Sequence, residues 1–184
     1  MTRIPRKPTV FLGHLERYLW ACLYCHKKKV LDAGSKDGYG AHLISSFANE
    51  VILADKDEWR LTVADQIYDF LCPARFLLID LEKEPIPDTY DVIVAFEFIE
   101  HLNDPDAFMV KAQGALKDNG VFLFSVPHMI ANPDHKTLFD EEKIKTFINK
   151  YFVITEFYIQ DKVVISGTPA LYPPKSYIGV AIKK

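Results

Sequence analysis

Three carboxylates and a glycine-rich turn are the residues of this chain whose types and spacing could do chemistry. Asp32, Asp55 and Asp80 each end a short apolar run, and Gly34 and Gly38 follow the first of them. A carboxylate accepts hydrogen bonds from hydroxyl and amino groups, and a turn leading into a helix presents unpaired backbone N–H groups. Ligands of parallel sheets sit beyond the carboxyl ends of the strands. The pattern therefore predicts a cofactor site at that edge.

A second candidate group follows the fourth apolar run. Glu97, Glu100 and His101 would share one side of a helical turn at the rim of the site. An imidazole titrates near neutral pH, so we expect His101 to act as general base beside Glu100, ahead of His128 and His135. Carboxylates and imidazoles can also bind a divalent cation, but such a helix start works in many proteins without metal. The prediction assigns no metal ligand.

Strands and helices alternate along the whole chain. We expect strands at 30–32, 51–55, 76–80, 91–96, 121–126, 152–159 and 177–182, with helices between most of them. Asp57, Asp104 and Asp140 should cap helices, Leu71 should face inward, and Asn119-Gly120 should close a helix. This order predicts an α/β fold with a mostly parallel sheet covered on both faces.

One domain over residues 1–184 is expected from the chain length and the absence of an internal linker. Residues 1–9 should form a loose arm, and residues 160–176 a loop beside the acceptor. Residues 10–28 should form a helix whose apolar residues Leu12, Leu15, Leu19 and Cys22 recur at helical spacing, with Glu16 and Arg17 elsewhere on the helix.

Composition excludes several classes of protein. The chain is 49% hydrophobic with a net charge of −3, so it should be globular, without a field that attracts nucleic acid or anionic membrane. No apolar run approaches the roughly 18 residues of a membrane span, and the basic, proline-broken start is no secretory signal. Three cysteines argue against a disulfide framework. We expect a cytoplasmic protein, and the oligomeric state stays open.

Taken in order, these motifs resemble those of the class I S-adenosylmethionine-dependent methyltransferases, from about residue 10 to the end. The similarity is greatest to the branch containing the ubiquinone-biosynthesis O-methyltransferases. The matching segments are Val30–Gly38, Asp55, Asp80-Leu81, Pro87–Ile93, Glu97–Pro105 and Gly120–Pro127. The family commonly has glycine where Lys36 stands, so the lysine must point away from the cofactor or meet its carboxylate.

The resemblance implies a Rossmann-like, doubly wound sheet of seven strands, the last antiparallel, and an enzyme that binds S-adenosylmethionine and releases S-adenosylhomocysteine. Asp55 would bind the ribose hydroxyls and Asp80 the adenine amino group. The residues assigned to the cofactor are Asp32, Ala33, Gly34, Ser35, Gly38, Asp55, Lys56, Asp80, Leu81, Phe96 and Glu97. The expected acceptor is an oxygen, before a nitrogen, of a small molecule or sugar.

Four other interpretations remain open. With His135, the Glu97–His101 segment resembles the magnesium site of small-RNA 3′-end 2′-O-methyltransferases, although the chain has no basic stripe. The glycine spacing and Tyr158-x-x-x-Lys162 match short-chain dehydrogenases, but Tyr158 falls in a strand-like stretch. Cys22-x-x-Cys25-His26 matches a haem attachment spacing, yet buried helix cysteines explain it better. A non-catalytic binding module of the same fold is the fourth.

Overall fold

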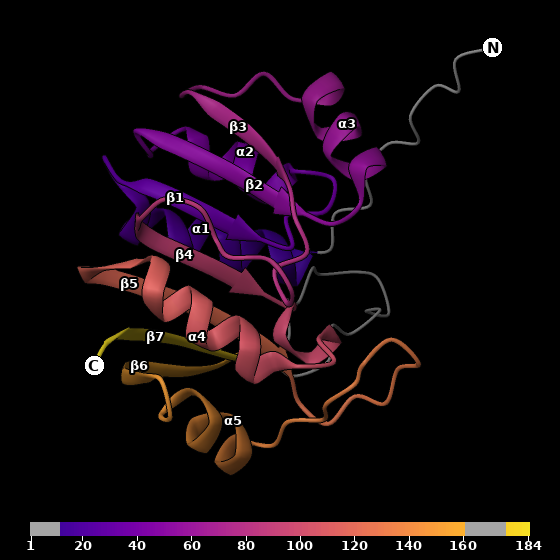
Figure 1. The fold of residues 1–184 in the computed structure, drawn as a ribbon, viewed down its shortest axis with the longest axis vertical. Helices are drawn as coiled ribbons and strands as arrows, with labels where there is room; N and C mark the ends of the chain where they lie inside the picture. Colours follow the sequence, from indigo (N-terminus) through magenta and orange to yellow (C-terminus); the bar gives the residue numbers. More distant parts are fainter. Residues whose placement is uncertain (1–11, 161–175) are drawn as a thin grey trace, which may run out of the picture.

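The computed structural model describes residues 12–160 and 176–184, in which strands and helices alternate as the sequence predicts (Figure 1). In chain order the elements are α1 (Leu12–Cys25), β1 (Lys29–Ala33), α2 (Tyr39–Ser45), β2 (Glu50–Asp55), α3 (Glu58–Ile67), β3 (Ala74–Leu78), β4 (Tyr90–Phe96), the 3-10 turn η1 (Ile99–His101), α4 (Pro105–Ala115), β5 (Leu116–Pro127), α5 (Glu141–Ile148), β6 (Phe152–Gln160) and β7 (Ser176–Lys183).

The seven strands form one sheet in the order β3-β2-β1-β4-β5-β7-β6. The neighbours from β3 to β5 pair in parallel, while β7 is antiparallel to both β5 and β6. The predicted fold class, with an antiparallel last strand, is confirmed. The chain moves outward from β1 in one direction and then returns to place β4 on its other side, which creates the switch point where such sheets bind ligands.

Two apolar layers cover the sheet. Helices α1, α2 and α3 pack on one face, and α4 and α5 pack on the other (Figure 1). Neighbouring residues of β1 divide between the layers, because Val30 packs with the first helices and Leu31 with the second. Burial on both faces explains why the strands of the sheet centre are continuous apolar runs.

Aspartate caps begin three helices as the sequence predicts. The side chains of Asp57, Asp104 and Asp140 accept hydrogen bonds from backbone N–H groups in the first turns of α3, α4 and α5. These caps fix where each helix begins after the loop that follows a strand.

Two predicted helix ends are wrong. Helix α3 ends at Ile67 because Tyr68 is already extended, and Leu71 is 71% exposed instead of inward. Helix α4 ends at Ala115, before Asn119-Gly120, because Leu116 turns extended and pairs with Tyr90 of β4. At α4 the backbone leaves the helix for a strand partner that the local pattern does not show.

The predicted inward face of α1 is only partly right. Cys22 is buried as predicted, but Leu12 and Leu19 are about half exposed, and Arg17 is buried together with Tyr18 and Ala21. Arg17 and Tyr18 face inward because they contact polar side chains at the strand ends, as described below.

No helix within the described ranges combines the length and apolar character needed to cross a bilayer. The predicted arm at 1–9, and the predicted acceptor-side loop apart from its end residues Gln160 and Ser176, lie outside the described residues.

Candidate active site

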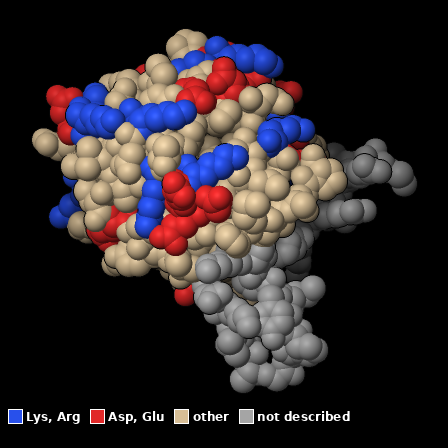
Figure 2. Space-filling model, turned by 90° about the horizontal axis from the view of Figure 1, so that it is seen from below, with Lys and Arg blue, Asp and Glu red and all other residues tan. Residues whose placement is uncertain are grey.

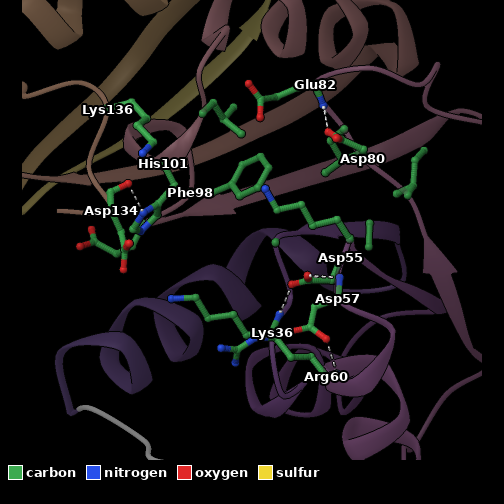
Figure 3. A pocket seen from close by; sticks show the side chains of 17 residues that line it. Lys36, Asp55, Asp57, Arg60, Asp80, Glu82, Phe98, His101, Asp134 and Lys136 are labelled. Carbon is green, nitrogen blue, oxygen red and sulfur yellow. Dashed lines mark hydrogen bonds and ion pairs between the residues drawn. The ribbon is translucent and has the colours of Figure 1, made fainter. Parts of the chain in front are cut away.

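A cavity of about 460 Å³ opens at the carboxyl ends of β1, β2, β3 and β4, at the switch point of the sheet (Figure 3). Its lining comes from the loops that follow these strands and from the loop between β5 and α5. The lining residues are Gly34, Lys36, Ala54, Asp55, Lys56, Asp57, Arg60, Ile79, Asp80, Leu81, Glu82, Glu97, Phe98, His101, Leu102, Asp134 and Lys136.

The glycine-rich turn after β1 is fixed by β2. The N–H groups of Gly34 and Ser35 both donate to the Ala54 carbonyl, at 2.8 and 3.1 Å. Gly34 has φ +71°, and a Cβ there would lie 2.4 Å from the Phe98 ring. The glycine is therefore required both by the backbone conformation and by the ring that packs on it.

Lys36 adopts the left-handed backbone conformation that glycine takes most readily. Its φ is +49°, and its N–H donates to Oδ2 of Asp55 at 2.9 Å. Such a conformation is unfavourable for a residue with a Cβ. The bond to Asp55 holds it in place, and the side chain lines the cavity beside Asp57 and Arg60 (Figure 3).

Asp55 and Asp80 both line the cavity, at the ends of the neighbouring strands β2 and β3 (Figure 3). Oδ1 of Asp55 accepts from the Asp57 N–H at 2.9 Å, so both its oxygens are oriented by backbone and each keeps a further lone pair. Asp80 accepts from the Glu82 N–H at 3.1 Å and pairs with Lys83 at 2.8 Å. The Lys83 ammonium holds the pKa of Asp80 below its usual value.

Asp32 does not line the cavity but lies fully buried behind it. Its Oδ1 accepts from the Tyr18 hydroxyl at 3.0 Å, and its Oδ2 has no partner among the described residues. Burial raises the pKa of Asp32 to about 7, against the lowering effect of the Tyr18 hydrogen bond. The ring of Tyr18 in turn fills the space of the side chain that Gly40 lacks.

Glu97 is held rigidly at the end of β4. Its backbone has φ +47°, its N–H donates to Ser125, and its carboxylate accepts from the Ser125 hydroxyl at 2.9 Å. Arg17 of α1 approaches the same carboxylate to 3.5 Å and donates to Gln160 of β6 at 2.9 Å. These contacts join α1, β4, β5 and β6 at one wall of the site.

Glu100 and His101 lie on the turn η1, directly after Glu97. Glu100 is 1% exposed, and neither of its carboxylate oxygens has a hydrogen-bond partner among the described residues. Burial and the nearby Glu97 raise its pKa. His101 faces the cavity with its Nε2 3.8 Å from Glu100, and burial lowers the pKa of its imidazole.

The structure brings together only part of the predicted site. The predicted residues that line the cavity are Gly34, Asp55, Lys56, Asp80, Leu81, Glu97 and His101, whereas Asp32, Ala33, Ser35, Gly38, Phe96 and Glu100 lie outside its lining. Gly38 serves packing, because a Cβ there would meet Ala64 of α3 at 2.5 Å.

Sequence reasoning missed Arg17 as a site residue, and it gave no role to Phe98 or Arg60. The position of Phe98 between Glu97 and Glu100 was the available signal, since that stretch was already recognised as functional. The prediction that placed Arg17 off the apolar face of the helix relied on apolar spacing alone.

The remaining candidate residues lie in surroundings that fit structural roles. Cys22 and Cys25 are buried in α1, where burial raises the pKa of the Cys22 thiol to about 11, while His26 is exposed. This arrangement fits helix packing, not haem attachment. Tyr158 lies on β6 as expected and bonds Glu156, and Lys162 lies outside the described residues. His128 bonds Tyr177 away from the cavity lining.

Comparison with known proteins agrees with this geometry. Residues 21–154 match the family model described as a methyltransferase domain. Over 112 residues the chain is 40% identical to a Mycolicibacterium smegmatis protein named "Probable S-adenosylmethionine-dependent methyltransferase", covering 58% of this chain and 40% of that protein. It is 31% identical over 105 residues to a ubiquinone biosynthesis O-methyltransferase of Idiomarina loihiensis, covering 53% and 42%. These matches span about two fifths of the length of the relatives.

A solved structure shares the fold at low identity. The N-methyltransferase NodS of Bradyrhizobium japonicum, in complex with S-adenosyl-L-homocysteine, superposes with a TM-score of 0.75 at 12% identity, covering 93% of this chain and 85% of NodS. At this identity the likeness establishes the fold.

Proposed function

The chain belongs to the family of S-adenosylmethionine-dependent methyltransferase domains, and from that premise we propose that it methylates an oxygen of a small molecule or sugar. The observation that carries the proposal is the meeting of Asp55, Asp80, Gly34 and His101 around one cavity at the switch point of the sheet. Asp55 and Asp80 suit a nucleoside, and His101 suits an acceptor.

The residues present fit the cofactor. Asp55 retains acceptor positions for the ribose hydroxyls, and Asp80, at the end of the neighbouring strand, is placed for the adenine amino group, with Ile79 and Leu81 as apolar lining. The buried atoms Oδ2 of Asp32 and Oγ of Ser35 have no hydrogen-bond partners among the described residues, as expected of groups that bind the polar methionine end of the cofactor. When bound, the cofactor supplies a methyl group already activated by its sulfonium.

The chain's own residues orient the reactants and exclude water. The locked Glu97 and the Phe98 ring form the wall between the glycine turn and η1, so they limit where an acceptor can enter. Alignment of this kind accounts for much of the rate of a displacement whose leaving group is already good.

The acceptor side is defined by Glu100 and His101. Nδ1 of His101 lies 3.1 Å from the Asp134 carbonyl, which can only accept, so Nδ1 carries the hydrogen and Nε2 keeps its lone pair. That lone pair can act on a hydroxyl group in the cavity. An oxygen acceptor requires such activation, whereas an unprotonated amine does not, and this favours oxygen.

Nucleic acid is a poorer acceptor on electrostatic grounds. On the face seen in Figure 2, basic and acidic side chains lie next to one another and form no continuous basic field. A net charge of −3 adds no attraction for phosphate.

Transfer of labelled methyl groups tests the proposal. The protein is incubated with a metabolite extract and S-adenosylmethionine carrying tritium in the methyl group, and the labelled product is identified by mass spectrometry. We expect a methyl ether of a small molecule or sugar, formed by the wild type and not by Asp55→Ala. A labelled amine or labelled RNA would contradict the acceptor assignment, and absence of any product would contradict the enzymatic proposal.

A further inference from the structure

We propose that Lys36 and Lys136 bind an anionic group of the methyl acceptor, a carboxylate or a phosphate, close to the hydroxyl group that is methylated. This binding mode rests on the methyl transfer proposed above and specifies the chemical class of the acceptor. It follows from two ammonium groups that lack ionic partners among the described residues and that flank His101 in the cavity.

The two lysines reach the cavity from different segments. Lys36 belongs to the turn after β1, and Lys136 belongs to the loop between β5 and α5. Figure 3 shows their side chains on either side of His101. The N–H of Lys136 donates to the Glu100 carbonyl at 2.7 Å, which fixes the backbone of this lysine against η1. Two positive side chains are therefore attached to opposite borders of the acceptor side.

The charge of Lys36 acts on the acceptor side of the cavity. Burial lowers the pKa of the His101 imidazole, and the nearby Lys36 ammonium lowers it further. Burial raises the pKa of Glu100, and the same ammonium acts against that rise. The lysine side chain thus lies close to η1, where the acceptor hydroxyl is proposed to bind.

Two further cations of the cavity lining have other roles. Arg60 is paired with Asp37 at 2.9 Å. Lys83 lowers the pKa of Asp80, and Lys56 lowers it further, so the charge of Lys56 acts where the adenine is proposed to bind. These contacts leave Lys36 and Lys136 as the cations of the described lining that face the acceptor.

Carboxylates on the acceptor side do not neutralise these two lysines. Glu97 is approached by Arg17 at 3.5 Å, and Glu100 is 1% exposed with a raised pKa, which favours its uncharged form. Asp134 lines the cavity as an exposed carboxylate, but its side chain forms no ion pair among the residues that the structure describes. Positive charge therefore exceeds negative charge at this end of the cavity.

The backbone of Lys36 gives a separate reason to assign its side chain a role. Its φ of +49° is unfavourable for a residue with a Cβ. The bond to Asp55 uses only the backbone N–H, so glycine could make the same bond without that cost. What the lysine adds is its ammonium group in the cavity, and residues held in such conformations cluster at binding sites.

Together with His101, the two lysines can recognise an acceptor at two points. Nε2 of His101 keeps its lone pair for the hydroxyl group, and the ammonium groups can donate charge-assisted hydrogen bonds to a carboxylate or phosphate. An acceptor whose hydroxyl lies a few bonds from its anionic group satisfies both. Because the net charge of the chain is −3, the attraction for an anion is local to this cavity.

Titration with small anions tests the site without a known acceptor. The full chain is saturated with S-adenosylhomocysteine and titrated at constant ionic strength with inorganic phosphate and, separately, with acetate. The imidazole signals of His101 are followed by NMR. We expect a saturable shift with at least one of the two anions in the wild type, and about 10-fold weaker binding in Lys36→Gln and in Lys136→Gln.

Lys27 provides a matched control. It is also an exposed lysine with a left-handed backbone, at φ +56°, but it lies outside the cavity lining, so Lys27→Gln should bind the anions as the wild type does. Lys36→Gly separates the side chain from the turn. This variant should resist urea at least as well as the wild type and bind the anions as weakly as Lys36→Gln.

Three results of the titration would overturn the proposal. They are no saturable shift with either anion, affinities that Lys36→Gln and Lys136→Gln leave unchanged, and wild-type binding by Lys36→Gly. Urea unfolding checks that each variant is folded.

The labelled product of the methyl-transfer experiment provides a second test. It should be retained on an anion exchanger at neutral pH, and release by a phosphatase would distinguish a phosphate from a carboxylate. With the isolated acceptor, Lys136→Gln should raise KM about 10-fold and change kcat little. A neutral or cationic product would contradict the anionic acceptor. Absence of any product would contradict methyl transfer alone, because the anion titration is scored independently.

Discussion

At the scale of single residues, the site depends on carboxylates that differ in their surroundings. Asp55 and Asp80 are oriented by backbone N–H groups at the cavity, whereas Asp32 is buried behind it and meets Tyr18. Only Asp32 and Glu100, among the carboxylates of this region, combine near-complete burial with an oxygen lacking a partner in the described structure. These two are therefore the carboxylates with the most to gain from a bound positive charge.

Asp32 should make the free protein less stable as the pH rises. Its pKa is about 7 in the folded chain against 3.8 in the unfolded one, so between these values the folded state binds more protons and the free energy of unfolding falls with pH. Asp32→Asn keeps an acceptor for Tyr18 but cannot ionise. Relative to this variant, the wild type should lose up to about 4 kcal/mol from pH 4 to pH 8.

Urea unfolding of both proteins across this pH range measures the difference. Parallel curves for the wild type and Asp32→Asn would show that Asp32 titrates normally and would contradict its desolvation. Saturation with S-adenosylhomocysteine, whose polar methionine end is proposed to contact Asp32, should reduce the loss.

At the scale of elements, helix α1 closes the site through a close contact with α2. The Tyr18 ring packs where a side chain of Gly40 would stand, and its hydroxyl reaches Asp32 from there. The edge-on contacts of Tyr18 with Tyr39 and Phe96 complete this arrangement. Small size at position 40 is thus what allows α1 to approach the end of β1.

Replacing Gly40 with alanine should destabilise the protein, although alanine is the better helix former. The added Cβ would lie 2.1 Å from the Tyr18 ring, so the ring must move and the bond to Asp32 is weakened. We expect a loss of about 2 kcal/mol in the free energy of unfolding, measured by urea denaturation.

Gly114 provides the matched control in the same experiment. It lies in α4, where an added Cβ meets nothing within 4 Å, so Gly114→Ala should be neutral or stabilise the protein by up to about 1 kcal/mol. If Gly40→Ala behaved like Gly114→Ala, Tyr18 would not be packed on α2 as the structure shows.

Much of the fold was predictable from the sequence because strands and helix starts have clear sequence patterns. The continuous apolar runs at Val51–Asp55 and 91–96 are strands of a buried parallel sheet, and Asp57, Asp104 and Asp140 mark helix starts by their capping chemistry. Helix ends and helix faces were harder to predict. Leu116 leaves α4 because Tyr90, distant in sequence, pairs with it.

The site was predictable where it lies at strand ends and less so where helices contribute. Asp55, Asp80 and Glu97 follow apolar runs and reach the cavity as expected. Arg17 and Tyr18 face inward because they contact Glu97 and Asp32. These contacts cannot be inferred from the spacing of apolar residues in α1. Lys36 stands where the resemblance led us to expect glycine, and its backbone is left-handed, as a glycine's could be.

At the scale of the whole molecule, the sheet order creates one crevice and the two helix layers make its walls. The strands β1 and β4 are neighbours at the switch point, and the loops after β1, β2, β3 and β4 all reach the same cavity. The account as a whole therefore stands on one claim, that this cavity binds the adenosyl cofactor between Asp55 and Asp80.

Calorimetric titration with S-adenosylhomocysteine tests that claim most directly. We predict a single binding site in the wild type, binding weakened at least about 30-fold in Asp55→Ala through loss of two charge-assisted hydrogen bonds, and wild-type affinity in Asp65→Ala, which removes an exposed carboxylate of α3 outside the cavity lining. No binding by the folded wild type, or equal affinity in Asp55→Ala, would contradict the account.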